Sequence, residues 1–264
     1  MTPNAKKKLK TLIGRGADAV GALARKFSSK MVIITFHRVN DWMEEDGITC
    51  NSEKFEAFCR FFQSHFKVVP LSEQIAGCHT GPGMGGTLSI TFDDGYRDNA
   101  EVAAPILLNL GLPATFFVAS GFIGTDYAPP WDGHLDRQPG WMSWDEVRAL
   151  RDHTFEIGAH THRHIDLGMA EPELIRGDLA RCREKLREEL GESPRLFAYP
   201  FGGRQNISPS SVELVREAGF ECCLSACGGV NAPVADPFHL NRISVGGWFS
   251  TPHQFAFEIL ADRD

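Results

Sequence analysis

The chain has 264 residues, and 27 Lys and Arg against 34 Asp and Glu give a formal net charge of −7. Hydrophobic residues make up 42% and charged residues 23%, an ordinary globular composition that excludes a disordered, collagen-like or disulfide-scaffold protein. The net acidity argues against a nucleic-acid partner, whose protein surface would be basic. The length suits one large α/β domain or two small ones.

The cysteines and the hydropathy pattern predict the cellular compartment of the protein. Seven cysteines are an odd number and form no CxxC pair, which is typical of a reducing compartment. No stretch approaches the ~18 consecutive apolar residues of a membrane span. A secretory signal needs an unbroken apolar stretch, which Arg15 and Asp18 interrupt near the start of the chain. We therefore expect a cytoplasmic protein without a signal peptide.

The first 30 residues differ in charge from the rest, because they carry eight basic side chains and one acidic side chain, Asp18. Apolar residues from Leu9 to Phe27 recur at helical spacing within this segment. One hypothesis is a peripheral helix that lies on an anionic lipid surface, at the inner membrane. The other, which we favour, is a helical arm packed on the domain or frayed in solution. We divide the chain into this basic arm, residues 1–30, and one domain, residues 31–264.

From residue 31 onward, short β-rich runs alternate with helical patterns. The strands are predicted at residues 31–37, 87–92, 114–119, 155–159, 196–199, 221–226 and 239–245. Between them, helix signals include Ser143 with Glu146 in a capping box, and a charged helix from Pro172 to Gly191. This alternation predicts an α/β fold, a parallel (β/α) barrel of about seven strands in a single domain. A doubly wound open sheet is the alternative.

In such barrels the chemistry lies at the carboxyl ends of the strands. The strand LSITF runs into Asp93 and Asp94, the strand FEIGA runs into HTHRH at residues 160–164, and MVIITF ends in His37. Two adjacent carboxylates repel each other unless a cation or strong donors lie between them. A metal ion at this end of the barrel would meet that need.

Three of these side chains have the composition of a catalytic zinc site. Catalytic zinc takes three protein ligands from His and Asp or Glu and keeps one position open for water. Asp94, His160 and His164 supply that number, which leaves Asp93 free to act as a base. The four-residue spacing of the histidines also occurs in zinc proteases, but Thr161 stands where their motif has Glu and the segment follows a strand.

The motifs resemble those of the polysaccharide deacetylases, carbohydrate esterase family 4. Residues 91–95 match the TFDDG motif, residues 160–164 match H-[S/T]-x-x-x-H about 65 residues later, and residues 197–202, FAYPFG, are similar to the third motif. The resemblance covers residues 31–245. It implies a distorted β/α barrel that uses a divalent metal, usually Zn²⁺, to remove the N-acetyl group of an N-acetylated amino sugar, oligosaccharide or polysaccharide.

The same resemblance implies roles for individual residues. Asp93 corresponds to the general base, and Asp94, His160 and His164 correspond to the metal ligands. Thr161 corresponds to a residue that supports the histidine loop. In the third motif, which also contains Tyr199, a backbone N–H near Phe201 would be the second donor to the oxyanion.

Two departures from the family pattern leave alternatives open. Many members have an arginine that orients the base two residues before the proline of the third motif, where this chain has Ala198; Arg204 or Arg242 would then replace it. The late leucine-and-histidine motif, which supplies the general acid, lacks its histidine here. His37 is the preferred acid, because a histidine after the first strand resembles the biofilm poly-N-acetylglucosamine deacetylases, and His239 is the reserve.

Residues 124–141 form a long irregular stretch in which Trp131 and Trp141 are candidates for an aromatic platform under sugar rings. The alternative is that these tryptophans only pin the loop to the barrel. Asp132 and Trp248 are weaker candidates of the same kind. The expected partner is an N-acetylated glycan, and the sequence leaves the oligomeric state open. Two alternative functions remain: hydrolysis of a small cyclic amide or ureide on the same fold, and a barrel that binds glycan without catalysis.

Overall fold

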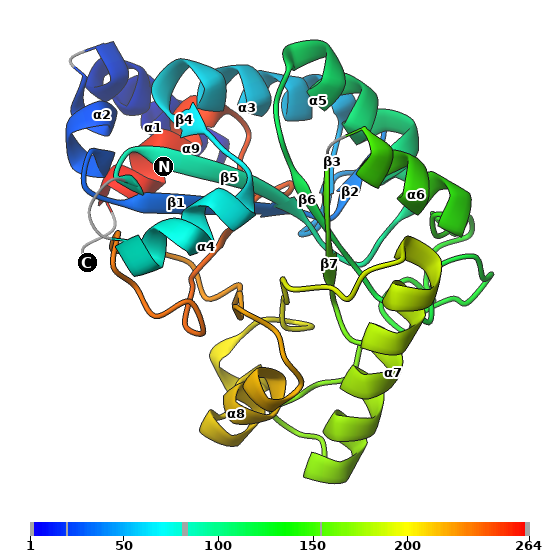
Figure 1. Cartoon of the computed structure of the whole chain (residues 1–264). Coiled ribbons are helices and arrows are strands. Elements are labelled where there is room, and N and C mark those ends of the chain that lie inside the picture. Colours follow the sequence, from blue (N-terminus) through cyan, green and yellow to red (C-terminus); the bar gives the residue numbers. More distant parts are fainter. Residues whose placement is uncertain (1–2, 20, 81–83, 154, 262–264) are drawn as a thin grey trace.

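A ring of parallel strands forms the centre of the molecule. The structure, a computed structural model, describes residues 3–19, 21–80, 84–153 and 155–261, so residues 1–2 and 20 of the predicted arm and residues 262–264 of the predicted domain lie outside the described residues. The order β7-β6-β5-β1-β8 runs through the main sheet (Figure 1). The strands of this path are β1 (Met31–Phe36), β5 (Thr87–Phe92), β6 (Thr115–Val118), β7 (Glu156–Ala159) and β8 (Ile243–Ser244), and the short strand β4 (Lys67–Val68) pairs with the start of β5 beside it.

Three single parallel bridges close this sheet into a ring. They join Ala159 to Phe197, Ala198 to Leu224, and Leu224 to Leu240, and the chain then continues from Leu240 into β8 beside β1. The segments around residues 197 and 224 therefore occupy the two remaining positions of a seven-stranded barrel. The predicted strands at residues 196–199 and 221–226 are present only as single bridges, and the one at 239–245 is present as a bridge at Leu240 followed by β8, which pairs with β1. The expectation of a distorted parallel barrel in a single domain is confirmed, and the open sheet is excluded.

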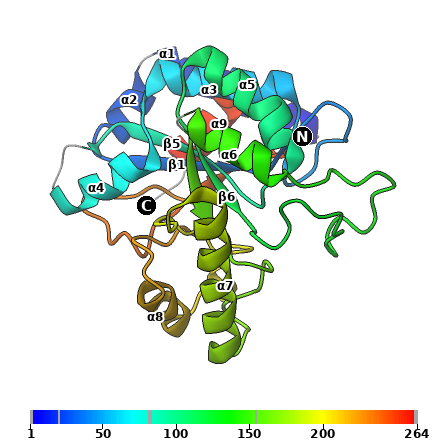
Figure 2. The same ribbon diagram turned by 45° about the vertical axis from the view of Figure 1, so that its right-hand side comes forward.

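Helices surround the barrel on the outside. They are α1 (Pro3–Ala19), α2 (Ala22–Phe27), α3 (Ser52–His65), α4 (Leu71–Thr80), α5 (Ala104–Leu110) after a π turn at Asn99–Ala103, α6 (Trp144–Asp152), α7 (Pro172–Leu190), α8 (Pro209–Glu217) and α9 (Pro252–Ala261). Short strands β2 (Arg38–Val39), β3 (Thr49–Cys50) and β4 (Lys67–Val68) and a 3₁₀ turn at Arg204–Asn206 complete the described elements. Helices α3 and α5 lie over the regular strands, and α7 and α8 lie on the opposite side, beside the irregular ones (Figure 2).

The local signals for two helices hold as predicted. Ser143 and Glu146 form a reciprocal capping box at the start of α6, and Gly191 ends α7 in a left-handed conformation.

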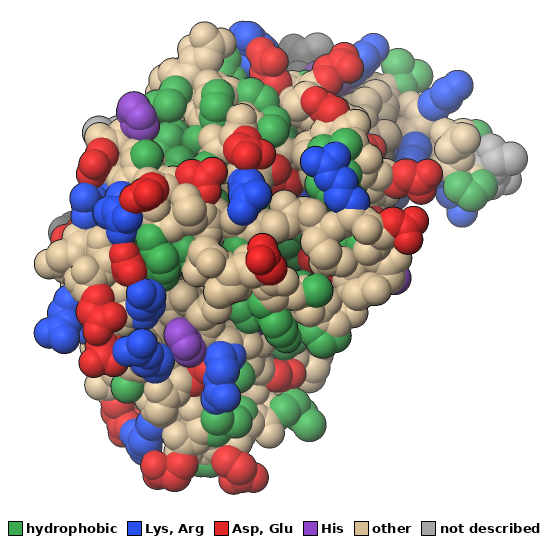
Figure 3. All heavy atoms as spheres, turned by 90° about the vertical axis from the view of Figure 1, so that its right-hand side faces the viewer, with side chains coloured by type: hydrophobic (Ala, Val, Ile, Leu, Met, Phe, Trp, Pro, Cys, Tyr) green, Lys and Arg blue, Asp and Glu red, His purple; other side chains and the backbone are tan. Residues whose placement is uncertain are grey.

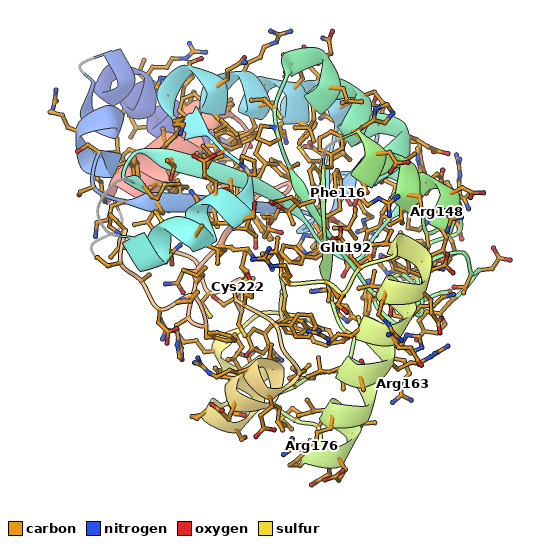
Figure 4. All side chains as sticks on the ribbon, viewed as in Figure 1. Phe116, Arg148, Arg163, Arg176, Glu192 and Cys222 are labelled. Atoms are coloured by element: carbon orange, nitrogen blue, oxygen red, sulfur yellow. The ribbon has the colours of Figure 1, made fainter. Side chains whose placement is uncertain are left out.

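Charged side chains of both signs alternate over the face that carries α6 and α7 (Figure 3). Arg148 and Arg176 project from these helices toward Glu189 and Glu217 (Figure 4). None of the described helices combines the length and the apolar character that a bilayer span needs.

The core beneath α3 consists of stacked aromatic rings on the outer face of the sheet. Phe92 on β5 stacks on Phe36 of β1 at 5.7 Å and on Phe116 of β6 at 4.8 Å, and Phe55 of α3 closes over the first pair. All four rings are fully buried. Because Phe92 directly precedes Asp93, this packing fixes the strand end from which the polar residues start.

The arm joins the domain through two helices. Helix α2 leads into β1, and Phe27 at its end is buried against Phe66. Helix α1 lies along α9 (Figure 1), where Lys10 pairs with Glu258 at 2.5 Å and the Thr11 and Thr251 hydroxyls are 3.1 Å apart. The described part of the segment is thus packed on the domain.

We predict that Phe92→Ala lowers the free energy of unfolding by about 3–5 kcal/mol, because it removes a buried ring whose neighbours cannot fully collapse into the space. Urea denaturation followed by circular dichroism measures this value. Leu108→Ala is the matched control, since Leu108 is 45% exposed on α5 and its truncation should cost little. Equal losses in the two variants would show that the ring stack does not stabilise this part of the barrel.

Candidate metal and catalytic site

The side chains that follow β1, β5 and β7 meet in one cavity at the carboxyl end of the barrel. Its volume is about 420 Å³. It is lined by His37, Ile48, Asp93, Asp94, Trp131, His160, His164, Phe201, Ala226, Ser244 and Trp248. Of the predicted site residues, this set contains both aspartates, all three histidines assigned to the site, Trp131 and Phe201. The ends of three strands thus converge as the sequence pattern predicts.

Asp94, His160 and His164 form a three-atom cradle. The Nε2 atoms of His160 and His164 lie 3.3 and 3.2 Å from Asp94 Oδ1, and one ligand atom from each residue lies within 4.8 Å of the others. A tetrahedral ion with bonds of about 2.0–2.2 Å separates its ligand atoms by about 3.3–3.6 Å. Asp94 Oδ1 is buried and has no hydrogen bond of good geometry, as expected for an oxygen that faces a shared central point. These residues therefore fit a zinc-like ion.

The surroundings orient this cradle. His160 Nδ1 lies 2.9 Å from the carbonyl oxygen of Ala198, which holds a proton on Nδ1 and leaves Nε2 with a free lone pair. Burial by itself would raise the pKa of Asp94, but the neighbouring imidazoles of His160 and His164 outweigh burial and hold that pKa well below its ordinary value. An ionised carboxylate and a correctly oriented imidazole are the forms that bind a metal.

The backbone of the site is strained. Among the described residues, four that are not glycine have positive φ angles: Asp94 at 75°, Thr161 at 62°, His164 at 54° and Phe201 at 62°. Three of them line the cavity and the fourth, Thr161, lies between two of the histidines. Such conformations cost free energy and persist only where the surrounding structure imposes them. Because these residues cluster at the cavity, we infer that the positions of their side chains are maintained here despite the free-energy cost of a strained backbone.

A buried carboxylate on α7 holds the histidine loop in that conformation. Asp178 is 3% exposed and accepts hydrogen bonds from the backbone N–H groups of His162 at 2.6 Å and Arg163 at 3.3 Å. The Thr161 carbonyl accepts from the N–H of Ser120 at 3.2 Å, while the Thr161 hydroxyl has no partner among the described residues. Thr161 thus takes part through its backbone, and Asp178 supplies support that the sequence motif did not reveal.

Asp93 lines the same cavity and forms a two-pronged ion pair with Arg242 inside the barrel. Both oxygens of Asp93 accept from the Arg242 guanidinium at 2.7 Å, and both side chains are buried. Burial alone would raise the pKa of Asp93, but Arg242, and to a lesser extent His160 and His37, outweigh burial and lower it. Asp93 is therefore ionised at neutral pH and able to accept a proton.

Four further groups fix Arg242, which is fully buried. Its Nε donates to the carbonyl of Ser225 at 2.8 Å, and its Nη1 lies 3.3 and 3.1 Å from the hydroxyls of Thr35 and Thr91. The guanidinium also lies over the ring of Phe117 at 5.6 Å. Of the two arginines proposed from the sequence, Arg242 is the one that contacts the base. Arg204 instead lines a separate cavity.

His37 also lies near Asp93. Its Nε2 is 4.0 Å from Asp93 Oδ2, and its Nδ1 is buried without a partner among the described residues. Burial lowers the pKa of His37, and the two aspartates oppose that shift only in part. The Asn99 amide donates to the His37 carbonyl at 2.6 Å and fixes the backbone of this residue. The reserve candidate, His239, is outside the cavity: its side chain is exposed, pairs with Asp236 and lines the cavity that Arg204 also lines.

The two tryptophans of the long loop have different positions. Trp131 lines the cavity and lies 4.6 Å from the His164 ring, so it is available to a sugar. Trp141 is buried, stacks on Tyr96 at 4.6 Å and donates its indole N–H to the Tyr127 carbonyl. The expectation that Trp141 belongs to a platform is corrected, because its ring pins the loop to the barrel.

A buried polar chain anchors Trp131. Its indole N–H donates to the Tyr96 hydroxyl at 2.9 Å, which in turn donates to Asp132 at 2.8 Å. Asp132 pairs with Arg38 at 2.5 Å, and Arg38 also holds Asp46 and Thr49 of the neighbouring loop. Asp132 is therefore a scaffold residue. Arg38 and Tyr96 were missed from the sequence, although an arginine directly after a buried strand is an unusual signal.

The third motif places only one of its candidates at the cavity. Phe201 is 53% exposed, lies edge-on to His164 at 4.7 Å, and its backbone N–H has no acceptor among the described residues. Tyr199 is buried outside the barrel against Phe197 and does not line the cavity, which corrects the expectation for that residue. Strand alternation explains this, since Ala198 takes the inward position. Trp248, a weaker candidate, does line the cavity.

Comparisons with known proteins give one family. Residues 80–223 match the family model described as polysaccharide deacetylase. The chain is 23% identical over 156 residues to YxkH of Bacillus subtilis, covering 59% of this chain and 50% of that protein. It is 22% identical over 224 residues to the poly-beta-1,6-N-acetyl-D-glucosamine N-deacetylase of Escherichia coli K12, covering 72% of this chain and 33% of that enzyme. The chain thus spans half the length of one of these relatives and a third of the other.

Two solved structures share the fold. IcaB from Ammonifex degensii superposes with a TM-score of 0.74 at 23% identity, covering 88% of this chain and 98% of that one. The Streptococcus pyogenes deacetylase PplD in complex with acetate superposes with a TM-score of 0.72 at 17% identity, covering 88% and 99%. At these identities the likeness establishes the barrel architecture.

The geometry predicts strong coupling between Asp93 and Arg242. Arg242→Met leaves a buried carboxylate unpaired and should cost about 3–5 kcal/mol of unfolding free energy, whereas adding Asp93→Asn to that variant should restore part of the loss. Urea unfolding of the four proteins of this cycle, with a chelator present, measures the coupling. Because the pKa of Asp93 is lowered in the folded protein, the coupling should be complete above about pH 4 and decline as the pH falls further. Additive losses at neutral pH would contradict it.

Proposed function

The chain belongs to the polysaccharide deacetylase family, and from that premise we propose that it hydrolyses the N-acetyl group of an N-acetylated glycan or amino sugar with the help of a divalent metal. One observation carries the proposal: the Asp94, His160 and His164 cradle lies beside a carboxylate, Asp93, that a buried arginine keeps ionised. This is the donor set of a metal hydrolase with a separate general base.

Asp94, His160 and His164 would hold the ion, and zinc is the ion we propose. Two imidazoles and one carboxylate suit zinc and leave a coordination position open. When bound, such an ion lowers the pKa of a coordinated water toward neutrality and polarises the acyl oxygen. The general base, the general acid and the second donor to the acyl oxygen are proposed to come from the chain itself.

Asp93 is proposed as the general base. Its carboxylate accepts a proton from the attacking water, and its pairing with Arg242 fixes which way the oxygens point. Arg242 acts through Asp93 and does not line the cavity, so it is a positioning residue. The Phe201 N–H is proposed to donate to the acyl oxygen as negative charge develops there.

His37 is proposed as the general acid. After the carbonyl is attacked, the leaving amine needs a proton, and His37, whose Nε2 lies 4.0 Å from Asp93 in the same cavity, is the imidazole that we propose donates it. Burial lowers its pKa, which makes the protonated imidazole a readier donor once it forms.

The substrate is proposed to be a polymer or oligomer of N-acetylglucosamine. Support comes from Trp131, Phe201 and Trp248, whose aromatic side chains line the cavity as apolar faces suited to sugar rings. The printed names of the relatives from Escherichia coli and Staphylococcus aureus, poly-beta-1,6-N-acetyl-D-glucosamine N-deacetylases, point to the same substrate class.

The first test is metal dependence. Acetate release from N-acetylglucosamine oligomers should fall to background after exhaustive chelation and recover on addition of zinc. Asp93→Asn should lower kcat by ~10³-fold or more while zinc content, measured by mass spectrometry, stays near that of the unchanged protein. Asp152→Asn is the control, because Asp152 is an exposed carboxylate on α6 outside the cavity.

The outcomes also separate the alternatives. Full activity after removal of all metal, or in Asp93→Asn, would contradict the mechanism. Cleavage of an activated acetyl ester without release of acetate from any glycan would favour the cyclic amide or ureide hydrolase, which a panel of such substrates then tests. A metal-loaded protein that cleaves neither class would favour a barrel that only binds glycan.

A second test concerns the acid. We predict that His37→Ala lowers kcat on N-acetylated substrate by ~10²-fold or more with metal retained, because the leaving amine loses its proton donor. An activated ester, whose leaving group needs no proton, should be affected much less. His239→Ala is the matched control and should leave both rates near those of the unchanged protein. Equal losses on both substrates in His37→Ala would count against the acid role.

A further inference from the structure

Helix α1 shows its apolar residues to the solvent. Leu9, Leu12 and Ile13 are 45%, 67% and 44% exposed, and their spacing of three and four places them on one stripe of the helix. A helix that packs on a domain normally turns such a stripe inward. Here the stripe lies outward, so packing against the domain does not account for these residues.

The face that α1 turns to the domain is polar and closely fitted. Lys10 pairs with Glu258, and the Thr11 hydroxyl lies near that of Thr251 on the segment leading into α9. A side chain at Gly14 would come within 1.8 Å of the His253 carbonyl oxygen, so only glycine allows this approach. These contacts fix the rotation of α1 about its axis, and that rotation puts the apolar stripe outside.

Basic side chains border the exposed stripe. Lys6, Lys8 and Arg15 are exposed, and among the side chains that the structure describes, which do not include that of Asp18, no carboxylate lies within ion-pair distance of them. On one border, a groove of about 510 Å³ runs between α1 and the segment before α9. Its polar lining includes Asn4, Lys7, Lys8, Arg15, Ser250 and Thr251, with no acidic residue. Cations and hydroxyl groups without a carboxylate suit a phosphate group.

We propose that α1 is a membrane-surface helix that docks the barrel on an anionic phospholipid surface. Leu9, Leu12 and Ile13 enter the boundary between headgroups and acyl chains, and the basic border and groove bind lipid phosphates. A second copy of the chain is a poorer occupant, because a symmetric contact through this stripe would bring like-charged borders together. The surface is independent of the proposed deacetylation, since no residue of α1 lines the catalytic cavity.

The test is sedimentation of the full chain with vesicles. One set is phosphatidylcholine alone, and in the other roughly a third of the lipid is phosphatidylglycerol. The protein should bind the anionic vesicles at least ~10-fold more tightly, and the binding should weaken as salt is raised. Replacing Lys6, Lys8 and Arg15 with Gln should weaken binding roughly fivefold for each charge removed.

A serine triple variant tests insertion. Leu9→Ser, Leu12→Ser and Ile13→Ser together should reduce binding by at least ~10-fold, while circular dichroism and activity on a soluble substrate stay unchanged. The control is Leu108→Ser with Leu174→Ser, because these leucines on α5 and α7 are 45% and 43% exposed and should not affect binding.

Several results would overturn the proposal. These are equal affinity for the two vesicle types, unchanged binding by the serine variant, and loss of binding in the leucine control. Displacement by millimolar inorganic phosphate at constant ionic strength would indicate a phosphate site instead of a lipid surface. A dimer that forms without lipid and dissociates in the serine variant, seen by sedimentation velocity, would assign the stripe to a second copy.

Discussion

The ion pair between Arg242 and Asp93 is the constraint on which the catalytic end of the barrel depends. The arginine comes from the last strand of the ring and the aspartate from β5, and between them the guanidinium also reaches Thr35 of β1 and Thr91 of β5. Because β1 lies between β5 and β8 in the sheet, the ion pair crosses β1. Since a buried charge without its partner is strongly destabilising, the guanidinium is what allows the barrel to bury this carboxylate in its ionised form.

This arrangement also resolves the repulsion between two adjacent carboxylates. Asp93 and Asp94 follow each other along the chain, but the positive φ angle of Asp94 turns the two side chains to different surroundings. Asp93 meets a guanidinium, and Asp94 meets two imidazole nitrogens. Both pKa values are lowered by these separate partners despite burial. Both carboxylates are therefore ionised, which lets Asp93 accept a proton and lets Asp94 bind a metal ion.

Much of this site could be predicted from the sequence because strand ends converge. A buried run followed at once by polar residues identifies Asp93, Asp94, His160 and His37, and parallel strands bring their carboxyl ends to one rim. The seven strand positions followed from the same alternation of β-rich and helical runs. The two weakly paired strands, at residues 196–199 and 221–226, were also recognisable, although nothing in their composition showed that single bridges would replace ladders.

Some site residues could not be predicted because the sequence does not show which side chains of a strand point into the barrel and which point out. Leu240 and Arg242 point into the barrel, and His239 and Asn241 point out, so one residue of register decides whether Arg242 or one of its neighbours faces the base. The same alternation turns Ala198 inward and Tyr199 outward. The buried chain from Arg38 to Trp131 joins residues more than ninety positions apart, and no local pattern encodes such a pairing.

The strained backbone segments of this site are each held by contacts from another part of the fold. Four non-glycine residues with positive φ lie where they orient ligands or the wall of the cavity, and each belongs to a segment tied down from elsewhere in the fold. Asp178 of α7 holds the loop of Thr161 and His164, and Phe201 is followed by Gly202, whose carbonyl accepts from Ala226 at 2.8 Å. The strained residues after β5 and β7 follow regular strands, whereas Phe201 follows an irregular one, whose single bridges leave its end free to bend. Side chains of α7 and α8 pack on that half of the barrel.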